Sequence, residues 1–178
     1  MPNYCENDLY IDGTKDEVAK LLAHVATKER LFDFNNIIPY PEKFYKIDED
    51  LEKAGHKRLE NLGIFLDGVK NGYNSGGYEW CVENWNTKWN ASNCVRRDTS
   101  RRICISFSTA WSPPIPVIAK LHQLFPQCSL FLEYFEKGTA VCGGISFLSK
   151  DDWYFDEEWS PGKSVNKWEA TYKGCRGG

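Results

Sequence analysis

Residues 103–111 have the sequence Ile-Cys-Ile-Ser-Phe-Ser-Thr-Ala-Trp, in which large and small side chains alternate. A period of two places successive side chains on opposite faces of a strand, so the stretch predicts a strand with one large and one small face. Upstream, Thr87, Trp89 and Ala91 alternate with polar residues, and an arginine-rich turn at residues 96–102 separates the two runs. The pair predicts a β-hairpin with strands near residues 87–95 and 102–111.

Four further strands are expected outside this hairpin. Aromatic and aliphatic residues on either side of the turn Glu136-Lys137-Gly138 predict a second hairpin, with strands near residues 128–136 and 139–147. An alternating run that stops at Gly13 predicts a first strand near residues 4–11. A further short strand is predicted at residues 31–34.

Helical patterns alternate with these strands. Thr14 and Glu17 have the spacing of a capping box before a helix at residues 15–26, and a proline-rich stop precedes a second helix at residues 115–125. The apolar residues of each recur at helical spacing on one face: Val18, Leu21, Leu22 and Val25 in the first, and Val117, Ile118, Leu121, Leu124 and Phe125 in the second. A third, shorter helix, capped by Asn74 or Ser75, is expected to end near Asn86, with Tyr78, Cys81, Val82 and Trp85 on one face.

This order of elements predicts an α+β fold: a ferredoxin-like antiparallel sheet with helices on one face. We expect residues 1–150 to form a single domain. Residues 42–77, which are charged and then rich in glycine, are predicted to be an irregular insertion between the first βαβ part and the hairpins. Residues 151–178 are predicted to be a peripheral C-terminal extension, irregular over the acidic, aromatic stretch 151–158.

Composition restricts the classes of function. The formal net charge of −3 gives no overall attraction to nucleic acid or to an anionic membrane. The N-terminus lacks the pattern of a signal peptide, and no apolar run is long enough to span a membrane. The cysteines are odd in number, seven, and have no C-x-x-C spacing, which argues against a disulfide framework or a zinc site. We therefore expect a cytoplasmic protein with no metal and no cofactor.

Two segments carry a resemblance to a known family. Residues 78–91, Tyr-Glu-Trp-Cys-Val-Glu-Asn-Trp-Asn-Thr-Lys-Trp-Asn-Ala, and 109–114, Thr-Ala-Trp-Ser-Pro-Pro, resemble the YubB-type ferredoxin-like domain family of phages, prophages and bacterial plasmids. Further similarity lies at residues 7–13, 34–39 and 135–138 and extends to about residue 148. The resemblance implies a ferredoxin-like fold and a mobile-element setting, but no activity. Asn86 departs from the family's Gly, although Asn also tolerates positive φ.

The tryptophans of these segments form the first candidate site. Trp85, Trp89 and Trp111 are expected to converge where the short helix enters the sheet, with Trp80 on a different face of that helix. They form either a buried aromatic cluster or a ligand pocket. Lys88 is expected to point away from Trp89 on a strand, where its cation can meet an anionic or π-rich ligand.

Two other surfaces are candidates. The turn with Arg96, Arg97, Arg101 and Arg102 can grip phosphate or carboxylate, or it is a solvated hairpin end that protects a sheet edge. The third is the face of small residues, which either is open to a partner or lets helices pack closely. Its members are Cys104, Ser106, Ser108 and Ala110 on one strand and Ala140, Cys142, Gly144 and Ser146 on another.

The sequence predicts binding rather than catalysis. It contains none of the glycine-rich phosphate loops, G-x-S-x-G elbows or H-E-x-x-H motifs of the common enzyme classes. The favoured hypothesis is an interaction protein that acts on a host or element-encoded protein. The alternative is a nucleotide or nucleic-acid binder that uses the arginine tip and the Trp and Lys88 surface.

Overall fold

The computed structural model of the chain describes residues 3–46, 49, 73–98, 102–138, 141–148 and 153–156, the last four by their backbone alone. Most of the predicted insertion at residues 42–77 and most of the predicted extension at residues 151–178 therefore lie outside the described residues. The same holds for Arg101 and Ala140.

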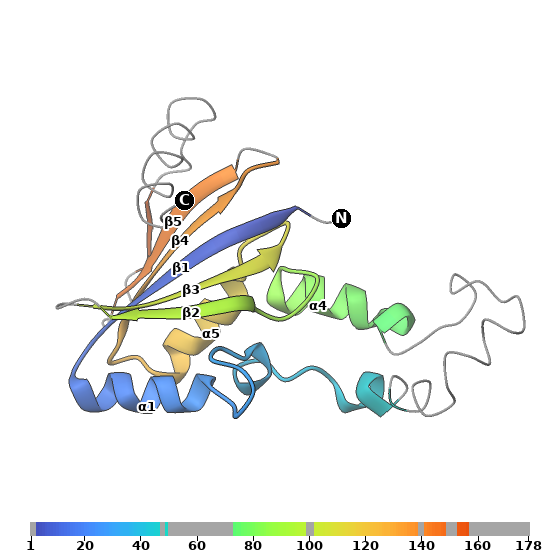
Figure 1. Ribbon diagram of the computed structural model, residues 1–178, viewed down its shortest axis with the longest axis horizontal. Helices are drawn as coiled ribbons and strands as arrows, with labels where there is room; N and C mark the ends of the chain where they lie inside the picture. Colours follow the sequence, from blue (N-terminus) through green and yellow to red (C-terminus); the bar gives the residue numbers. More distant parts are fainter. Residues whose placement is uncertain are drawn as a thin grey trace, which may run out of the picture.

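Within the described residues, the strands form one antiparallel sheet in the order β2-β3-β1-β4-β5-β6 (Figure 1). The strands are β1 (Tyr4–Asp12), β2 (Ser92–Asp98), β3 (Ile103–Ala110), β4 (Ser129–Glu136), β5 (Val141–Phe147) and β6 (Trp153–Asp156). Two helices, α1 (Lys15–Val25) and α5 (Ile115–Leu124), connect β1 to the β2-β3 hairpin and β3 to β4. This is the split βαβ topology of ferredoxin-like domains, so the predicted α+β fold is confirmed.

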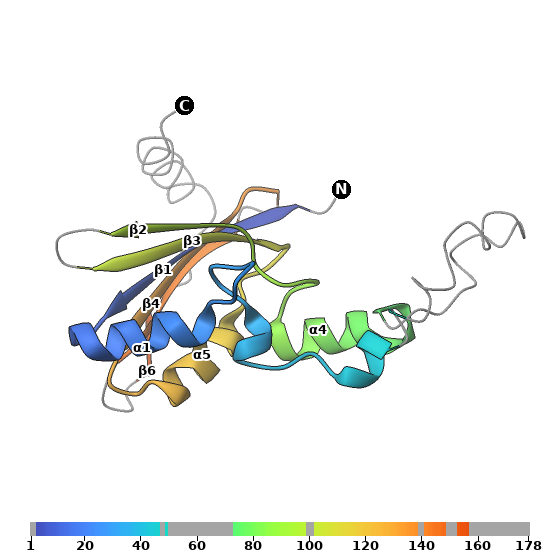
Figure 2. The same ribbon diagram turned by 60° about the horizontal axis from the view of Figure 1, so that its bottom comes forward.

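Both α1 and α5 lie against the same face of the sheet, as the sequence predicts (Figures 1 and 2). The Thr14 side chain caps α1 by accepting a hydrogen bond from the Glu17 amide at 3.3 Å, while the Glu17 carboxylate pairs with Lys20 at 3.1 Å. No helix in the described part of the chain is long and apolar enough to cross a membrane.

A shorter helix, α4 (Tyr78–Trp85), extends beside α5 and follows a π-helical turn at Tyr73–Gly77. Its N-cap residue is Gly77, which has no side chain that could cap the helix. The predicted cap at Asn74 or Ser75 is therefore wrong. The helix ends at Asn86, whose φ of 58° is left-handed. The tolerance of Asn for positive φ explains how it replaces the expected glycine.

The large face of the hairpin strand lies under the helices. Leu9 of β1 is paired with Ile105 of β3 on one side and Leu132 of β4 on the other, and Leu132 is paired with Ile145 of β5. These four side chains form a row across the sheet, and each is at most 2% exposed. Alternation along each strand therefore places one continuous apolar layer against α1 and α5.

The small residues of β3 lie on the opposite face of the sheet, where Cys104, Ser106 and Ser108 are nevertheless at most 5% exposed. Aromatic rings from β4 occupy some of the space that small residues leave on this face. A Cβ atom added to Gly144 would lie only 2.9 Å from the Phe131 ring. Small residues here thus make room for neighbouring rings.

Three local predictions are wrong. Residues 31–34 form no strand, because Asp33 caps a 3-10 helix, η1 (Phe34–Asn36), by accepting a hydrogen bond from the Asn35 amide. Strand β2 begins at Ser92 rather than at residue 87, and residues 86–90 form bends. Part of the stretch predicted to be irregular after residue 150 forms β6, which pairs with β5.

Candidate functional site

The tryptophans predicted to converge belong to two different environments. Trp85 is 3% exposed and packs in the core, and its indole Nε1 donates to the Ile38 carbonyl at 2.9 Å. The Trp80 ring lies 5.3 Å from it. Trp111, in contrast, is 43% exposed. The expected convergence of Trp85 with Trp89 and Trp111 is therefore wrong: Trp85 packs against Trp80 in the core, whereas Trp89 is half-buried and Trp111 is exposed.

Four side chains form what we call the aromatic surface: Tyr78, Lys88, Trp89 and Trp111. The Lys88 Nζ lies 5.3 Å from the ring centroids of both Trp89 and Trp111 and 5.9 Å from that of Tyr78. The rings of Tyr78 and Trp111 meet edge to face at 6.4 Å. Lys88 was predicted to point away from Trp89, which is wrong because residues 86–90 are not a strand. The cation instead contacts three rings.

The loop that carries Lys88 is fixed at its start by hydrogen bonds to the end of β3. The Asn86 Nδ2 donates to the Pro113 carbonyl at 2.9 Å, and the Ser112 hydroxyl donates to the Asn86 carbonyl. The Thr87 hydroxyl, in a residue that is 1% exposed, both accepts from the Ala110 amide and donates to the Ala110 carbonyl, each at 3.0 Å. Asn86 and Thr87 thus hold this loop against the residues that precede and follow Trp111.

The other end of the loop is fixed by Asn90. Its side-chain oxygen accepts from the Phe34 amide at 2.9 Å and from the Ala91 amide at 2.8 Å. Its side-chain nitrogen donates to the Asp33 carboxylate at 2.7 Å. Lys88 and Trp89 therefore lie between two anchored residues, which restricts the conformations of the part of the loop that faces outward.

The backbone at Trp111 is strained. Its φ is +66°, and the Ser112 amide donates to the Ala110 carbonyl at 2.8 Å across it, which closes a γ-turn. Positive φ at a bulky residue costs about 1–3 kcal/mol and persists only where surrounding contacts enforce it. Strand β3 therefore stops at Ala110, and the Trp111 side chain leaves the alternation predicted for it.

Hydrogen bonds enforce this turn, and one of them is completely buried. The Trp111 amide donates to the Asn3 carbonyl at 2.9 Å, and the Thr109 hydroxyl donates to the Ser112 carbonyl at 2.8 Å. The Asn7 side chain donates in turn to the Thr109 hydroxyl at 2.9 Å, and both residues are completely buried. Leaving the buried Asn7 or Thr109 side chain without its partner would cost about 1–3 kcal/mol, so the network holds the strained conformation in place.

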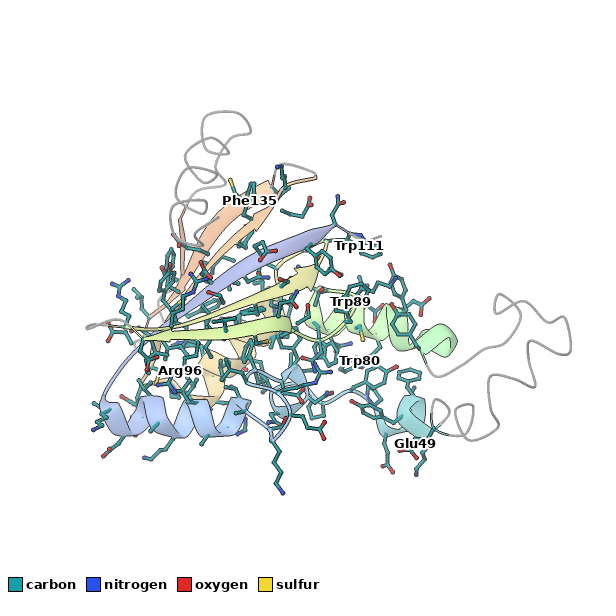
Figure 3. The ribbon with its side chains drawn as sticks, viewed as in Figure 1. Glu49, Trp80, Trp89, Arg96, Trp111 and Phe135 are labelled. Carbon is teal, nitrogen blue, oxygen red and sulfur yellow. The ribbon has the colours of Figure 1, made fainter. Side chains whose placement is uncertain are left out.

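Arg96, Arg97 and Arg102 lie far from the aromatic surface. Arg96 and Arg97 belong to β2 rather than to a turn, and Arg96 donates twice to the Asp98 carboxylate, at 2.7 and 2.9 Å. Arg102 precedes β3, whereas Trp111 follows it, and Figure 3 shows Arg96 and Trp111 at opposite ends of the sheet. Eight strand residues span roughly 25 Å, so the two groups cannot form one contiguous contact.

Strand β2 has the features of a protected edge. The register with β3 shifts between Ser92 and Val95, and Asn93, inside this bulge, has a φ of 52°. A bulge and charged side chains both hinder pairing with another strand. These features support the interpretation of Arg96 and Arg97 as part of a solvated hairpin that protects the edge of the sheet.

Most cysteines of the described residues are buried, and those that the structure describes are not in disulfides. Burial raises the pKa of the Cys5 thiol to about 12 and those of Cys81 and Cys104 to about 11, so these thiols are protonated at neutral pH. His122 directs Nδ1 to the Cys128 carbonyl at 3.2 Å. Within the described ranges, no group of three His, Cys, Asp or Glu side chains is arranged to hold a metal ion.

Sequence reasoning found three members of the aromatic surface but missed Tyr78 as a contact of Lys88, and it missed the polar network entirely. Asn7 and Thr109 are 102 positions apart, and nothing in either local pattern links them. One signal was available in the sequence. Asn7 is at an inward-facing position of β1, between inward-facing apolar residues, and a buried amide needs hydrogen-bond partners.

The topology defines the class of this protein as a ferredoxin-like α+β domain. The model of the family described as the ferredoxin-like domain in Api92-like protein matches residues 84–173, just over half of the chain, and the chain belongs to this family. The matched range includes β6, beyond the predicted limit of the resemblance near residue 148.

The crystal structure of protein api92 from Yersinia pseudotuberculosis has a similar fold, with a TM-score of 0.51. The alignment covers 91% of this chain and 99% of that chain, at 11% sequence identity. At this identity the similarity extends to the fold alone. No curated protein matches the chain in sequence.

Proposed function

We propose that this chain is a cytosolic binding protein that contacts a partner protein through the aromatic surface. The observation that carries the proposal is the conformation of Trp111: a large ring, 43% exposed, on a strained turn that a partly buried hydrogen-bond network enforces. Strained residues cluster at ligand contacts, and Trp and Tyr dominate the binding energy of protein interfaces. Because the loop and turn are already ordered, binding would cost little conformational entropy.

The partner in this proposal presents a carboxylate beside an apolar or aromatic side chain. Lys88 places a cation between three rings, so an Asp or Glu of the partner would meet the ammonium group while its neighbours pack on Trp89 and Trp111. Tyr4 is 48% exposed and pairs with Ala110, directly before Trp111, and it would extend the apolar contact area.

The biological setting belongs to the proposal as well. The resemblance of residues 78–91 and 109–114 to YubB-type domains supports an accessory protein of a phage, prophage or plasmid, with a partner encoded by the host or by the element. The odd number of cysteines, seven, supports a reducing compartment.

Affinity capture from the native host tests the function. The wild-type chain, Trp111→Gly and the control Leu124→Ala are used as baits, with and without nuclease. Leu124 is 44% exposed at the end of α5, so the control removes a similarly exposed apolar side chain from another surface. We expect the wild type and Leu124→Ala to capture the same protein, and Trp111→Gly to lose it.

Nuclease separates the two classes of partner. Capture that survives nuclease supports a protein contact. Capture that nuclease abolishes and that weakens steeply with salt would replace this proposal by nucleic-acid binding. Equal capture by the wild type and Trp111→Gly would remove the aromatic surface as the site.

A further inference from the structure

A pocket lies on the face of the sheet opposite the helices, where β1 ends and β4 begins. It has a volume of about 400 Å³, within the range of about 300–1,000 Å³ that is typical of small-molecule sites. It is far from Trp111, which follows β3 beside the start of β1. The side chains that line it come from β1, β4 and the end of β5, and they include Tyr10, Asp12, Ser129, Phe131, Ser146 and Leu148.

The register of the sheet places most of these side chains in two adjoining rows. Tyr10 of β1 is paired with Phe131 of β4, which is paired with Ser146 of β5. One row further on, Asp12 is paired with Ser129. Directly paired residues, and residues two apart along a strand, lie on the same side of a sheet. All five therefore project away from α1 and α5, because the residues that alternate with them belong to the buried core.

Two aromatic rings lie side by side in the pocket. The ring centroids of Tyr10 and Phe131 are 6.0 Å apart, and the planes of the rings differ by 26°. Both side chains are half-buried, so part of each ring is accessible from the pocket. Gly144 leaves the space that the Phe131 ring occupies, since an added Cβ atom would lie only 2.9 Å from it. The pair offers a ligand an apolar surface with two π faces.

Polar groups adjoin the rings on two sides. The Asp12 side chain is exposed, and its carboxylate has no hydrogen-bond or ion-pair partner among the described residues. Neighbouring strands are about 4.8 Å apart, and residues two apart along a strand about 7 Å. Asp12, Ser129 and Ser146 therefore lie at the margin of the ring surface. Arg102 also lines the pocket, but it already has another partner in the structure, and the site does not depend on its charge.

The charges beside the rings exclude some ligands. The row on the far side of the rings pairs Asp8 with Glu133, so carboxylates flank the rings on both sides. The phosphate of a nucleotide would be repelled by these carboxylates. A quaternary ammonium ion would suit the rings, but it has no donor or acceptor for the hydroxyls of Ser129 and Ser146. A neutral ligand with many hydroxyl groups can instead donate to Asp12 in charge-assisted hydrogen bonds.

From these features we infer that the pocket binds a neutral saccharide, one pyranose unit of which lies against the rings of Tyr10 and Phe131. The C–H groups on one face of the sugar contact the rings. Its hydroxyl groups donate to the Asp12 carboxylate and exchange hydrogen bonds with Ser129 and Ser146. This site is separate from the aromatic surface and does not rest on the proposed function.

Isothermal titration of the full chain with neutral disaccharides tests the inference. The probes are maltose, cellobiose, lactose and N,N′-diacetylchitobiose, which differ in linkage and substituents but all contain pyranose units. At least one is expected to bind with one-to-one stoichiometry and a Kd in the millimolar range or below. Adenosine monophosphate, a planar anion, and benzyltrimethylammonium, an aromatic cation, are expected to bind at least about tenfold more weakly. Failure of all four disaccharides, or a charged probe that binds as tightly as the best of them, would overturn the inference.

Variants locate the site. Phe131→Leu keeps an apolar side chain but removes the ring face, and Asp12→Asn removes the charged acceptor while keeping its shape. Each is expected to weaken the best disaccharide at least about tenfold. Glu29→Gln is the charge control, because Glu29 is also exposed but does not line the pocket, and it is expected to bind like the wild type. Asp12 is exposed, so a loss of binding in Asp12→Asn is not a consequence of misfolding.

A third variant tells the two aromatic sites apart. Trp111→Gly is expected to bind the disaccharide like the wild type, so a loss in that variant would move the sugar to the aromatic surface and overturn the inference. Thermal melts with saturating disaccharide provide a second readout, because a ligand of the folded state raises the melting temperature. A shift that persists undiminished in Asp12→Asn and Phe131→Leu would place the sugar elsewhere and would also overturn it.

Discussion

The strain at Trp111 can be measured by comparing two substitutions at this one position. Trp111→Gly and Trp111→Ala both remove the ring and its contacts with Tyr78 and Lys88. They differ in the backbone, because glycine adopts a φ of +66° without steric cost, whereas alanine keeps a Cβ atom and therefore the strain. The difference in their free energies of unfolding thus reports on the turn alone.

The expected difference follows from two opposing contributions. The left-handed region costs an L-residue about 1–2 kcal/mol, which alanine bears and glycine does not. Glycine loses about 0.4–1 kcal/mol more conformational entropy on folding. We therefore expect Trp111→Gly to be more stable than Trp111→Ala by about 0.5–1 kcal/mol, which corresponds to roughly 2 °C in melting temperature for a chain of this length.

Urea denaturation of the two variants is the assay, with Val95→Gly and Val95→Ala as the matched pair. Val95 is 51% exposed on β2 and does not have positive φ, so there alanine is expected to be the more stable residue. A Trp111→Ala protein that is as stable as Trp111→Gly, or more stable, would refute the strained turn and with it the main support for the proposed site.

Three further perturbations give expected outcomes. Burial, followed by the nearby Asp8 charge, raises the pKa of Glu133 above its usual 4.5; the stability linked to this group is present below that value and lost as pH rises. Glu133→Gln should therefore gain stability over the wild type in urea melts at pH 7 but not at pH 4. Asn90→Ala should cost about 1–3 kcal/mol in the same assay, because it leaves the Phe34 amide without its acceptor. Iodoacetamide at pH 8, followed by peptide mass mapping, should leave Cys5 unmodified until the chain unfolds.

The regular elements could be predicted because their signals are local. Alternation with a period of two predicted β3, β4 and β5 to within a few residues. Apolar residues at a spacing of about 3.6, together with the helix start and stop signals, predicted α1 and α5. The face of each element followed from the same patterns, because only one face of each helix is apolar. What alternation could not decide was which side of β3 faces the helices, since that depends on where the crossovers pass.

The wrong predictions share a physical origin. Thr87, Trp89 and Ala91 alternate with polar residues by coincidence, because Thr87 and Asn90 use their side chains to bind distant backbone rather than to follow a strand. Trp111 likewise continues the alternation of β3 in sequence but not in space, where the γ-turn rotates it outward. Side-chain bonds to distant backbone compete with strand pairing, and their partners cannot be read from neighbouring residues.

This competition explains why polar residues anchor the loop and the turn that carry the aromatic surface. Apolar packing at the end of β3 would tolerate small shifts of the loop, whereas hydrogen bonds at Thr87, Asn90 and Thr109 fix distances and directions. Buried polar groups contribute little net stability when paired and cost much when unpaired. Such a network therefore selects a single backbone geometry for Trp111, and a side chain kept in one exposed position is what a preorganised contact requires.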